Sequence, residues 1–144
     1  MLFGRKKRHI NRILVVEDEP LVAFDTEHFL GSAGFEIAAT VDTVAAACAT
    51  LEGGMDLDLV LVDINLSDGS GLDVARCAHG RGVPVLLVTG TCPQEAQVFA
   101  AGCLTKPYPQ KDLLSAIDAI GAVIGGAKLP RRLPSGFNLF RTAA

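Results

Sequence analysis

The chain alternates between short continuous apolar runs and longer stretches in which apolar residues recur every three or four positions. A continuous run of aliphatic residues is typical of a strand buried on both faces, and the longer spacing is typical of an amphipathic helix. The predicted strands are residues 13–16, 35–39, 59–62, 83–88 and 103–105. The predicted helices are 20–33, 44–51, 72–79, 92–101 and 109–124. The pattern is therefore strand–helix, repeated five times.

Capping and turn residues mark the ends of these segments. Pro20 suits the first position of a helix and has an acidic residue before it, and Gly34 suits the end of the same helix. Asp42 or Thr43 can cap the second helix, and residues 67–71 are a loop rich in Ser, Asp and Gly. Short connections between alternating strands and helices predict an α/β fold, a doubly wound, five-stranded parallel sheet with helices on both faces.

Size and composition point to one globular domain. The chain has 144 residues, of which 49% are apolar and 20% charged, with a formal charge of −3. A generally basic nucleic-acid-binding protein is disfavoured. No apolar run reaches the roughly 18–20 residues that a membrane span needs, and no apolar core of a signal peptide follows the basic residues 5–8. We therefore expect a cytoplasmic protein.

The predicted organisation has three parts. Residues 1–11 are a basic arm, residues 12–124 the folded domain, and residues 125–144 a C-terminal extension too short for a separate output domain. The basic cluster at 5–8 is interpreted as a solvated tail, with a partner, membrane-surface or nucleic-acid contact as the alternative. The extension is a poor helix because of Pro130, Pro134 and Gly136. Its apolar residues are expected to dock against the domain or across a dimer; they are Leu129, Leu133, Phe137, Leu139 and Phe140.

The four cysteines show no metal-binding or disulfide signature. Cys48, Cys77, Cys92 and Cys103 form no CxxC pair, and no histidine stands near them in a ligand pattern. We interpret them as small buried hydrophobic residues, and neither a zinc site nor a disulfide framework is expected.

Polar residues follow the predicted strands at their carboxyl ends. Glu17 and Asp18 follow the first strand, Asp63 the third, Thr89 the fourth and Lys106 the fifth. In a parallel sheet these ends share one edge, where ligands bind. Three carboxylates that meet there repel one another, and Mg²⁺, which prefers oxygen ligands, would relieve the repulsion.

This arrangement is suited to phosphoryl transfer. An aspartate carboxylate can attack phosphorus and form an acyl phosphate. The reaction then needs positioning and neutralisation of the phosphoryl oxygens, which Mg²⁺, the Lys106 ammonium and the Thr89 hydroxyl can supply. The sequence therefore predicts a magnesium site with an open place for a phosphoryl group.

Five motifs, each at a strand end or in the loop that follows, carry a resemblance to a known family. They are Val15-Val16-Glu17-Asp18-Glu19-Pro20, Val62-Asp63-Ile64-Asn65-Leu66, Asp68-Gly69-Ser70-Gly71-Leu72, Val88-Thr89-Gly90 and Leu104-Thr105-Lys106-Pro107. Each motif is weak alone, but all five occur in order. Over residues 12–124 the chain resembles the receiver domain of response regulators, which implies the (βα)5 flavodoxin-like receiver fold.

The resemblance also implies roles for individual residues. Asp63 is the expected phosphoacceptor. Asp18 is expected to bind Mg²⁺ directly and Glu17 through water, with Asp63 and the backbone carbonyl of Asn65 as further ligands. Thr89 and Lys106 are expected to contact the phosphoryl group.

Two further implications concern neighbouring residues. The Lys106–Pro107 peptide bond is expected to be cis, which proline makes accessible. Asn65 and Thr91, each two positions beyond a site residue, are expected to tune hydrolysis of the phosphate.

The chain departs from the family pattern at three positions. Cys103 stands where an aromatic residue is usual, three before Lys106, so the familiar rotamer switch cannot operate in its normal form, and Tyr108 is an alternative. Glu17 stands where Asp is commoner, and Ser67 where Pro is frequent. Neither of the last two changes removes the predicted chemistry.

The resulting hypothesis is a single-domain response regulator of a two-component system. It would accept a phosphoryl group from a histidine kinase or phosphotransfer protein and then act through protein contacts, or as a phosphate sink or shuttle. Its partners would include a downstream protein target and a second copy of the chain, with no direct binding to DNA. It would be no enzyme beyond its own phosphorylation and dephosphorylation.

Two alternatives stay open. Cys103 motivates the first, a pseudo-receiver that is an interaction module with a degenerate switch. The second, an aspartyl-phosphate enzyme of the haloacid-dehalogenase type, is disfavoured because Asn65 stands where that class needs a second acid.

Overall fold

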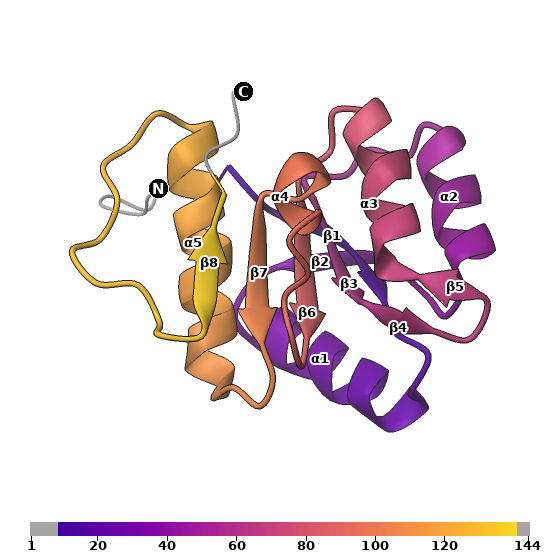
Figure 1. The fold of residues 1–144 in the computed structure, drawn as a ribbon, viewed down its shortest axis with the longest axis horizontal. Helices are drawn as coiled ribbons and strands as arrows, with labels where there is room; N and C mark the ends of the chain where they lie inside the picture. Colours follow the sequence, from indigo (N-terminus) through magenta and orange to yellow (C-terminus); the bar gives the residue numbers. More distant parts are fainter. Residues whose placement is uncertain (1–8, 141–144) are drawn as a thin grey trace.

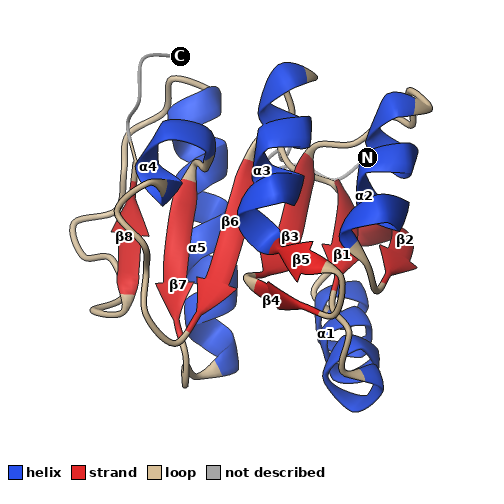
Figure 2. Ribbon diagram, turned by 45° about the vertical axis from the view of Figure 1, so that its right-hand side comes forward, coloured by secondary structure: helices blue, strands red, loops and turns tan. Residues whose placement is uncertain are grey.

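A computed structural model describes residues 9–140, and the predicted basic cluster at 5–8 lies outside this range. The described chain forms three layers, with a central sheet between two layers of helices (Figures 1 and 2). The strand order is β2-β1-β3-β6-β7-β8, and the first five of these strands are parallel. Their bounds are β1 Arg12–Val16, β2 Glu36–Val41, β3 Leu59–Asp63, β6 Val85–Thr89, β7 Gly102–Thr105 and β8 Phe137–Leu139.

The two faces of the sheet carry separate hydrophobic cores because strand side chains alternate between faces. Ile13 and Val15 pack with the apolar stripes of α1 (Pro20–Ser32) and α5 (Gln110–Ile124). Leu14 and Val16, the intervening residues, pack with the helices of the opposite face. Those helices are α2 Val44–Glu52, α3 Gly71–Gly80 and α4 Ala96–Phe99. The predicted doubly wound arrangement is confirmed.

Local signals placed some boundaries well and others poorly. Thr43, and not Asp42, caps α2, since its hydroxyl accepts a hydrogen bond from the Ala46 amide at 3.0 Å. The helix predicted at 92–101 was too long, because α4 covers only Ala96–Phe99 and the chain is already extended at Ala100. The predicted loop at 67–71 also proved more regular. Part of it forms a small antiparallel hairpin between β4 (Asn65–Leu66) and β5 (Gly69–Ser70).

The sheet has a sixth strand that the sequence did not predict. β8, from the C-terminal extension, pairs antiparallel with β7, so that Leu104 lies opposite Phe137 and Gly102 opposite Leu139. Phe137 is buried, and its ring lies directly against Gly102. A Cβ atom added at position 102 would lie 2.6 Å from a ring carbon of Phe137. Glycine at 102 therefore leaves room for this ring. The expected docking of the extension against the domain is confirmed, with Leu129, Leu133 and Leu139 packed on the same core.

At the other end of the described chain, Ile10 is buried in the core and the Asn11 amide donates a hydrogen bond to Asp58 at 2.8 Å. The folded part thus includes residues assigned to the predicted arm.

The prediction that all four cysteines are unpaired was wrong. Cys48 of α2 and Cys77 of α3 form a disulfide, with 5.7 Å between their Cα atoms. The two residues are 29 positions apart, and only the packing of the helices on one face of the sheet brings them together. Cys103 is buried as expected, and Cys92 is half-buried.

None of the helices within residues 9–140 has both the length and the apolar character that crossing a membrane requires.

Candidate functional site

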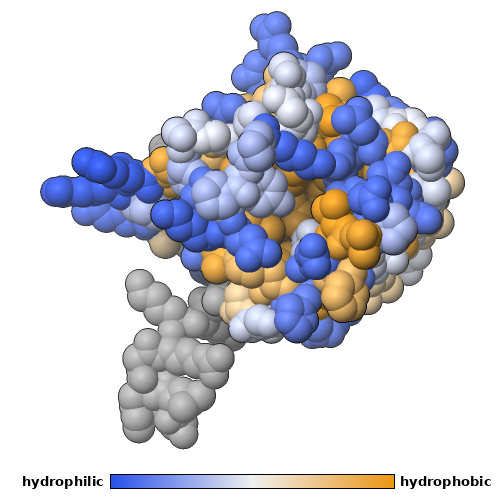
Figure 3. Space-filling view, turned by 90° about the horizontal axis from the view of Figure 1, so that it is seen from below, coloured by the Kyte–Doolittle hydropathy of each residue, from blue (hydrophilic) through white to orange (hydrophobic). Residues whose placement is uncertain are grey.

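The register of the sheet brings the predicted site residues to one edge. Val16 pairs with Val62, Asp63 with Val88, and Thr89 with Thr105, so that neighbouring strands end at the same level. Glu17 and Lys106 directly follow two of these strand ends. Figure 3 looks onto this edge and shows mostly hydrophilic side chains with apolar patches between them.

Asp63 lies at the centre of the site. Its side chain is only 7% exposed, and its Oδ2 forms an ion pair with the Nζ of Lys106. Its Oδ1 accepts a hydrogen bond from the Asn65 amide at 2.8 Å. A buried carboxylate is costly without such partners, so each oxygen is compensated by a different segment of the chain. The peptide bond between Lys106 and Pro107 is cis, as expected from the sequence.

Glu17 lies beside this ion pair. Together with Asp63, Lys106 and Tyr108 it lines a small cavity of about 20 Å³, room for one water molecule. Burial raises the pKa of Glu17 above its ordinary value, and the charges of Asp63 and Asp18 raise it further. A hydrogen bond from the Glu19 amide, at 3.1 Å, and the Lys106 charge oppose this rise. The site therefore carries acidic repulsion that Lys106 relieves only in part.

The three carboxylates do not form the ready-made cluster that the sequence predicted. Within residues 9–140, no group of three or more Asp, Glu, His or Cys side chains is arranged to hold a metal ion. Glu17 and Asp63 share a cavity, whereas Asp18 is exposed. The donors nevertheless fit Mg²⁺, since all are oxygen atoms, their mutual repulsion calls for a cation, and this ion typically takes one or two carboxylates and keeps its waters.

Thr89 and Thr91 interact with each other on the next strand end. The Thr89 hydroxyl donates to the Thr91 carbonyl at 2.9 Å and accepts from the Thr91 amide at 3.2 Å. Both residues line an open cavity of about 560 Å³, together with Asn65 and the hairpin residues Gly69 and Ser70. This cavity lies directly beside the segment that follows Asp63 and has room for a ligand group.

Gly71 has a structural role that its place in a motif did not reveal. A Cβ at this position would lie 2.5 Å from the Asp63 carbonyl oxygen and 2.8 Å from the Ile64 Cα. The Gly71 amide also donates to the Ile64 carbonyl at 2.8 Å. The first turn of α3 thus supports the backbone of the phosphoacceptor candidate directly, and only glycine allows so close an approach.

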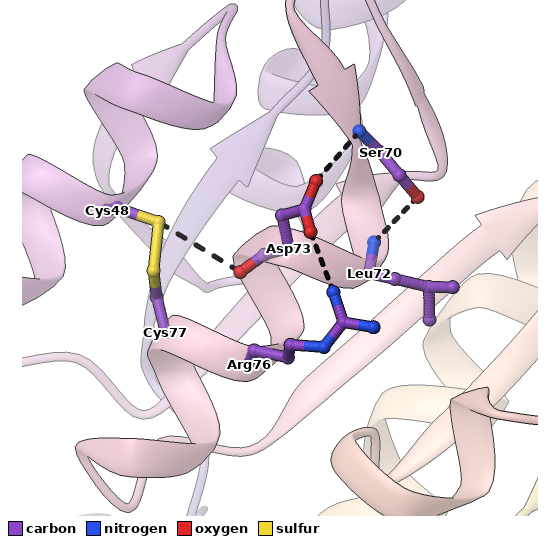
Figure 4. Close-up of polar contacts among 6 residues, drawn as sticks. All are labelled: Cys48, Ser70, Leu72, Asp73, Arg76 and Cys77. Carbon is purple, nitrogen blue, oxygen red and sulfur yellow. Dashed lines mark hydrogen bonds and ion pairs between the residues drawn. A yellow bond between two sulfur atoms is a disulfide. The ribbon is translucent and has the colours of Figure 1, made fainter.

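Two acidic residues anchor the hairpin between Asp63 and α3. Asp68 accepts hydrogen bonds from the amides of Val44 at 2.7 Å and Ala45 at 3.1 Å, at the start of α2, and these bonds lower its pKa. Asp73 and Ser70 form a capping box at the start of α3 (Figure 4). The motif that contains Asp68 indicates no role for this residue, because its partners are 23 and 24 positions away.

Cys103 and Tyr108 lie on either side of Lys106 in the sequence. Cys103 is fully buried in the core on the α2–α4 face, and burial raises the pKa of its thiol. It is therefore an inert core residue in this environment. Tyr108 is half-buried in the cavity, and its pKa is raised by burial and by the charges of Glu17 and Asp63. Tyr108 therefore contacts the site, whereas Cys103 does not line this cavity.

Comparison with known proteins identifies relatives over most of the chain. A family model described as the response regulator receiver domain matches residues 13–118. The cell cycle transcriptional regulator CtrA of Caulobacter vibrioides is 31% identical over 116 residues, which cover 76% of this chain and 49% of that protein. The sensory transduction protein RegX3 of Mycobacterium tuberculosis is 33% identical over 114 residues, covering 75% and 49%. The chain spans about half the length of these curated relatives.

Solved structures give the same result. A response regulator receiver protein from Sinorhizobium medicae superposes with a TM-score of 0.67 at 27% identity, covering 77% of this chain and 94% of that one. A CheY-like receiver domain protein from Methanospirillum hungatei has a TM-score of 0.67 at 30% identity, covering 75% and 90%.

Proposed function

The chain belongs to the response regulator receiver domain family, and on this premise we propose that it accepts a phosphoryl group on Asp63 in a Mg²⁺-dependent reaction. The observation that carries the proposal is the ion pair between Asp63 and Lys106. It joins a buried carboxylate to a cation at the edge of the sheet where ligands bind.

The reaction would be a transfer from a phosphorylated histidine. An oxygen of Asp63 forms the new bond to phosphorus while the bond from phosphorus to the donor nitrogen breaks, and the nitrogen keeps the electron pair. Lys106, already on Oδ2 and with 40% of its side chain exposed, can then neutralise a phosphoryl oxygen. The Thr89 hydroxyl can donate to another oxygen if it leaves the Thr91 carbonyl.

A bound Mg²⁺ would neutralise charge on the transferred group. Asp18, Asp63 and the Asn65 carbonyl would hold it, with Glu17 acting through water. The position of Glu17 supports this assignment, because it lines the same small cavity as Asp63 and Lys106. Asn65 and Thr91, which border the open cavity, would control the access of water to the acyl phosphate and hence its lifetime.

The donor would be a histidine kinase or a histidine phosphotransfer protein in the cytoplasm. Leu21 and Phe24 of α1 support docking of a protein there, since both are largely exposed and α1 begins directly after the acidic residues of the site. We propose that output proceeds through protein contacts, with a downstream target or a second copy, or that the protein acts as a phosphate sink. The net charge of −3 gives no support to DNA binding by this domain.

The deciding experiment is phosphorylation by acetyl phosphate with and without Mg²⁺, followed by intact-mass measurement. We expect the wild type to gain the mass of one phosphoryl group only with Mg²⁺, and Asp63→Ala to gain none. The matched control is Asp25→Asn, an exposed acid on α1, which should react like the wild type. A wild type that stays unmodified, or an Asp63→Ala variant that is modified equally, would refute the proposal.

A pseudo-receiver is the second candidate, and the burial of Cys103 at the usual aromatic position favours it. Sedimentation and partner-affinity measurements separate the two functions. A protein that is phosphorylated but changes neither its oligomeric state nor its affinity for a partner would be a pseudo-receiver.

A further inference from the structure

The disulfide between Cys48 and Cys77 joins two helices that lie side by side on one face of the sheet (Figure 4). Both cysteines are only half-buried. A small dithiol or a thiol-disulfide oxidoreductase can therefore reach the bond, unlike a disulfide enclosed in a core. Cys103, which is fully buried, offers a contrast within the same chain.

The two bridged helices are also linked at the end nearer Asp63. Asp68, in the turn of the β4–β5 hairpin, accepts hydrogen bonds from the first amides of α2. Ser70 and Asp73 fix the start of α3, and the hairpin connects Asp63 to that helix. The helices and the hairpin thus form a closed ring, with the disulfide on one side and Asp68 on the other.

This ring bears directly on the proposed phosphoacceptor. Gly71, the first residue of α3, packs against the Asp63 and Ile64 backbone, and its amide bonds the Ile64 carbonyl. Asn65, which begins the hairpin, donates its amide to the Asp63 carboxylate. A shift of α3 relative to α2 would therefore move both contacts of Asp63.

We propose that Cys48 and Cys77 form a reversible redox cross-link that controls how firmly the phosphoacceptor loop is held. In reduction, a dithiol reductant transfers two electrons. Its thiolate attacks one cysteine sulfur, the S–S bond breaks, and two cysteine thiols and the oxidised reductant result. In oxidation, a low-molecular-weight disulfide accepts the two electrons from the cysteines and leaves as two thiols. Electrons and atoms are thus balanced in both directions, and neither direction needs a metal ion.

The link from redox state to phosphorylation rests on the proposed function. That function places the protein with histidine kinases inside the cell, where thiols are kept reduced and the disulfides that do form are typically transient or redox-sensing. A permanent structural bond is not expected there, whereas a bond that responds to oxidants is. The oxidised ring holds Asp63 in its reactive position, so oxidation should favour phosphorylation.

The first experiment tests the bond itself. Purified protein is equilibrated in glutathione buffers of graded redox potential, denatured in alkylating reagent and analysed by mass. We expect two alkylated cysteines at the oxidising end, four at the reducing end, and a peptide that joins Cys48 to Cys77. Four alkylated cysteines throughout, or a Cys92–Cys103 peptide instead, would overturn the proposal.

The second experiment tests its consequence. Oxidised and reduced wild type are phosphorylated with acetyl phosphate and Mg²⁺, and hydrogen exchange of residues 64–72 is measured in parallel. We expect reduction to slow phosphorylation by about fivefold or more, a typical size for coupling between sites, and to speed exchange in this segment. The Cys48→Ala and Cys77→Ala variants should have the phosphorylation and exchange rates of the reduced wild type, and added dithiol should not change these rates. Cys92→Ala, the matched control, should respond to dithiol as the wild type does.

The outcomes separate this proposal from the proposed function. If neither redox form is phosphorylated, the proposed function fails, while alkylation and exchange still decide whether the cross-link controls the loop. If both forms are phosphorylated at equal rates and exchange alike, the cross-link is only structural and the switch is refuted. If the two forms are phosphorylated at equal rates but differ in hydrogen exchange, control of phosphorylation by the cross-link is likewise refuted.

Discussion

At the scale of single residues, the site depends on how one buried carboxylate is stabilised. Asp63 is supported on one oxygen by an amide two residues away and on the other by a cation 43 residues away. Removing Lys106 leaves one oxygen of the buried Asp63 carboxylate without its partner, which costs more than the pair contributes. Substitutions at these contacts should therefore reduce both stability and phosphorylation.

Lys106→Ala tests the ion pair. We expect a loss of about 1–2 kcal/mol in the free energy of unfolding, below the value for a fully buried pair because Lys106 is partly exposed, together with slower phosphorylation. Urea unfolding and intact-mass kinetics measure the two effects. Lys111→Ala, an exposed lysine on α5, is the control and should change stability by less than about 0.5 kcal/mol. Equal stability of the two variants would contradict the role assigned to the ion pair.

Gly71→Ala tests the contact behind Asp63. The new methyl group must displace the Asp63 carbonyl, so we expect a loss of about 1–3 kcal/mol and slower phosphorylation. Gly80→Ala, at the other end of the same helix, meets no atom within 4 Å and should be neutral or slightly stabilising. Thermal unfolding of both variants distinguishes the contact at residue 71 from a general effect of glycine in α3.

At the scale of elements, the hairpin between β3 and α3 connects the site to two helices. Its turn residue Asp68 bonds the first amides of α2, while the capping box of Ser70 and Asp73 begins α3. The capping box is local, whereas the Asp68 bonds join residues that are 23 and 24 positions apart in the chain. The position of the loop beside Asp63 is therefore set by α2 as well as by its own sequence.

The lowered pKa of Asp68 predicts how this connection depends on pH. Because the amides of Val44 and Ala45 lower its pKa below the ordinary 3.8, the unfolded chain binds more protons as the pH falls through this range. The contribution of Asp68 to stability is complete above pH 3.8 and is lost as the pH falls through the folded-state pKa. Asp68→Ala should be less stable than the wild type at neutral pH, and the difference should shrink in acid.

Thermal unfolding from neutral pH down to about pH 3 would measure this difference. Asp42→Ala is the control, because Asp42 is exposed. A difference for Asp68→Ala that stays constant over the whole range would show that the cap does not depend on the charge of the carboxylate.

At the scale of the whole molecule, the C-terminal extension completes the sheet. β8 covers the outer edge of β7, the strand that leads directly to Lys106, and the Thr105 amide bonds the Gly136 carbonyl at 2.8 Å. An uncovered strand edge is a template for pairing with another chain. The extension therefore stabilises the fold and keeps this edge from pairing with other molecules.

Phe137→Ala tests this role. Loss of the buried ring over Gly102 should cost about 3 kcal/mol and release β8, so we expect faster exchange of the Thr105 amide and self-association through β7. Unfolding, hydrogen exchange and light scattering measure these effects. Asn138→Ala, an exposed neighbour on the same strand, should leave all three nearly unchanged. A Phe137→Ala variant with the same oligomeric state as the wild type and a slowly exchanging Thr105 amide would show that β8 does not depend on this ring.

Local patterns in the sequence were sufficient for the five parallel strands, their helices and the edge at which the site lies. Aliphatic runs that end in Glu17, Asp63 or Thr89 specify both a buried strand and the polar residue at its carboxyl end. A parallel sheet then brings those ends together whatever the details of packing. The family resemblance in the same motifs is confirmed by the match over residues 13–118.

Only the tertiary structure decided the features that depend on contacts between distant segments. Neither the Cys48–Cys77 disulfide nor the capping of α2 by Asp68 follows from spacing, because each depends on how α2 and α3 pack together. β8 has just three residues, and its pairing with β7 depends on the space above Gly102. Sequence patterns report which face of an element is buried, whereas partners that are distant along the chain are selected by packing, and packing exists only in the folded molecule.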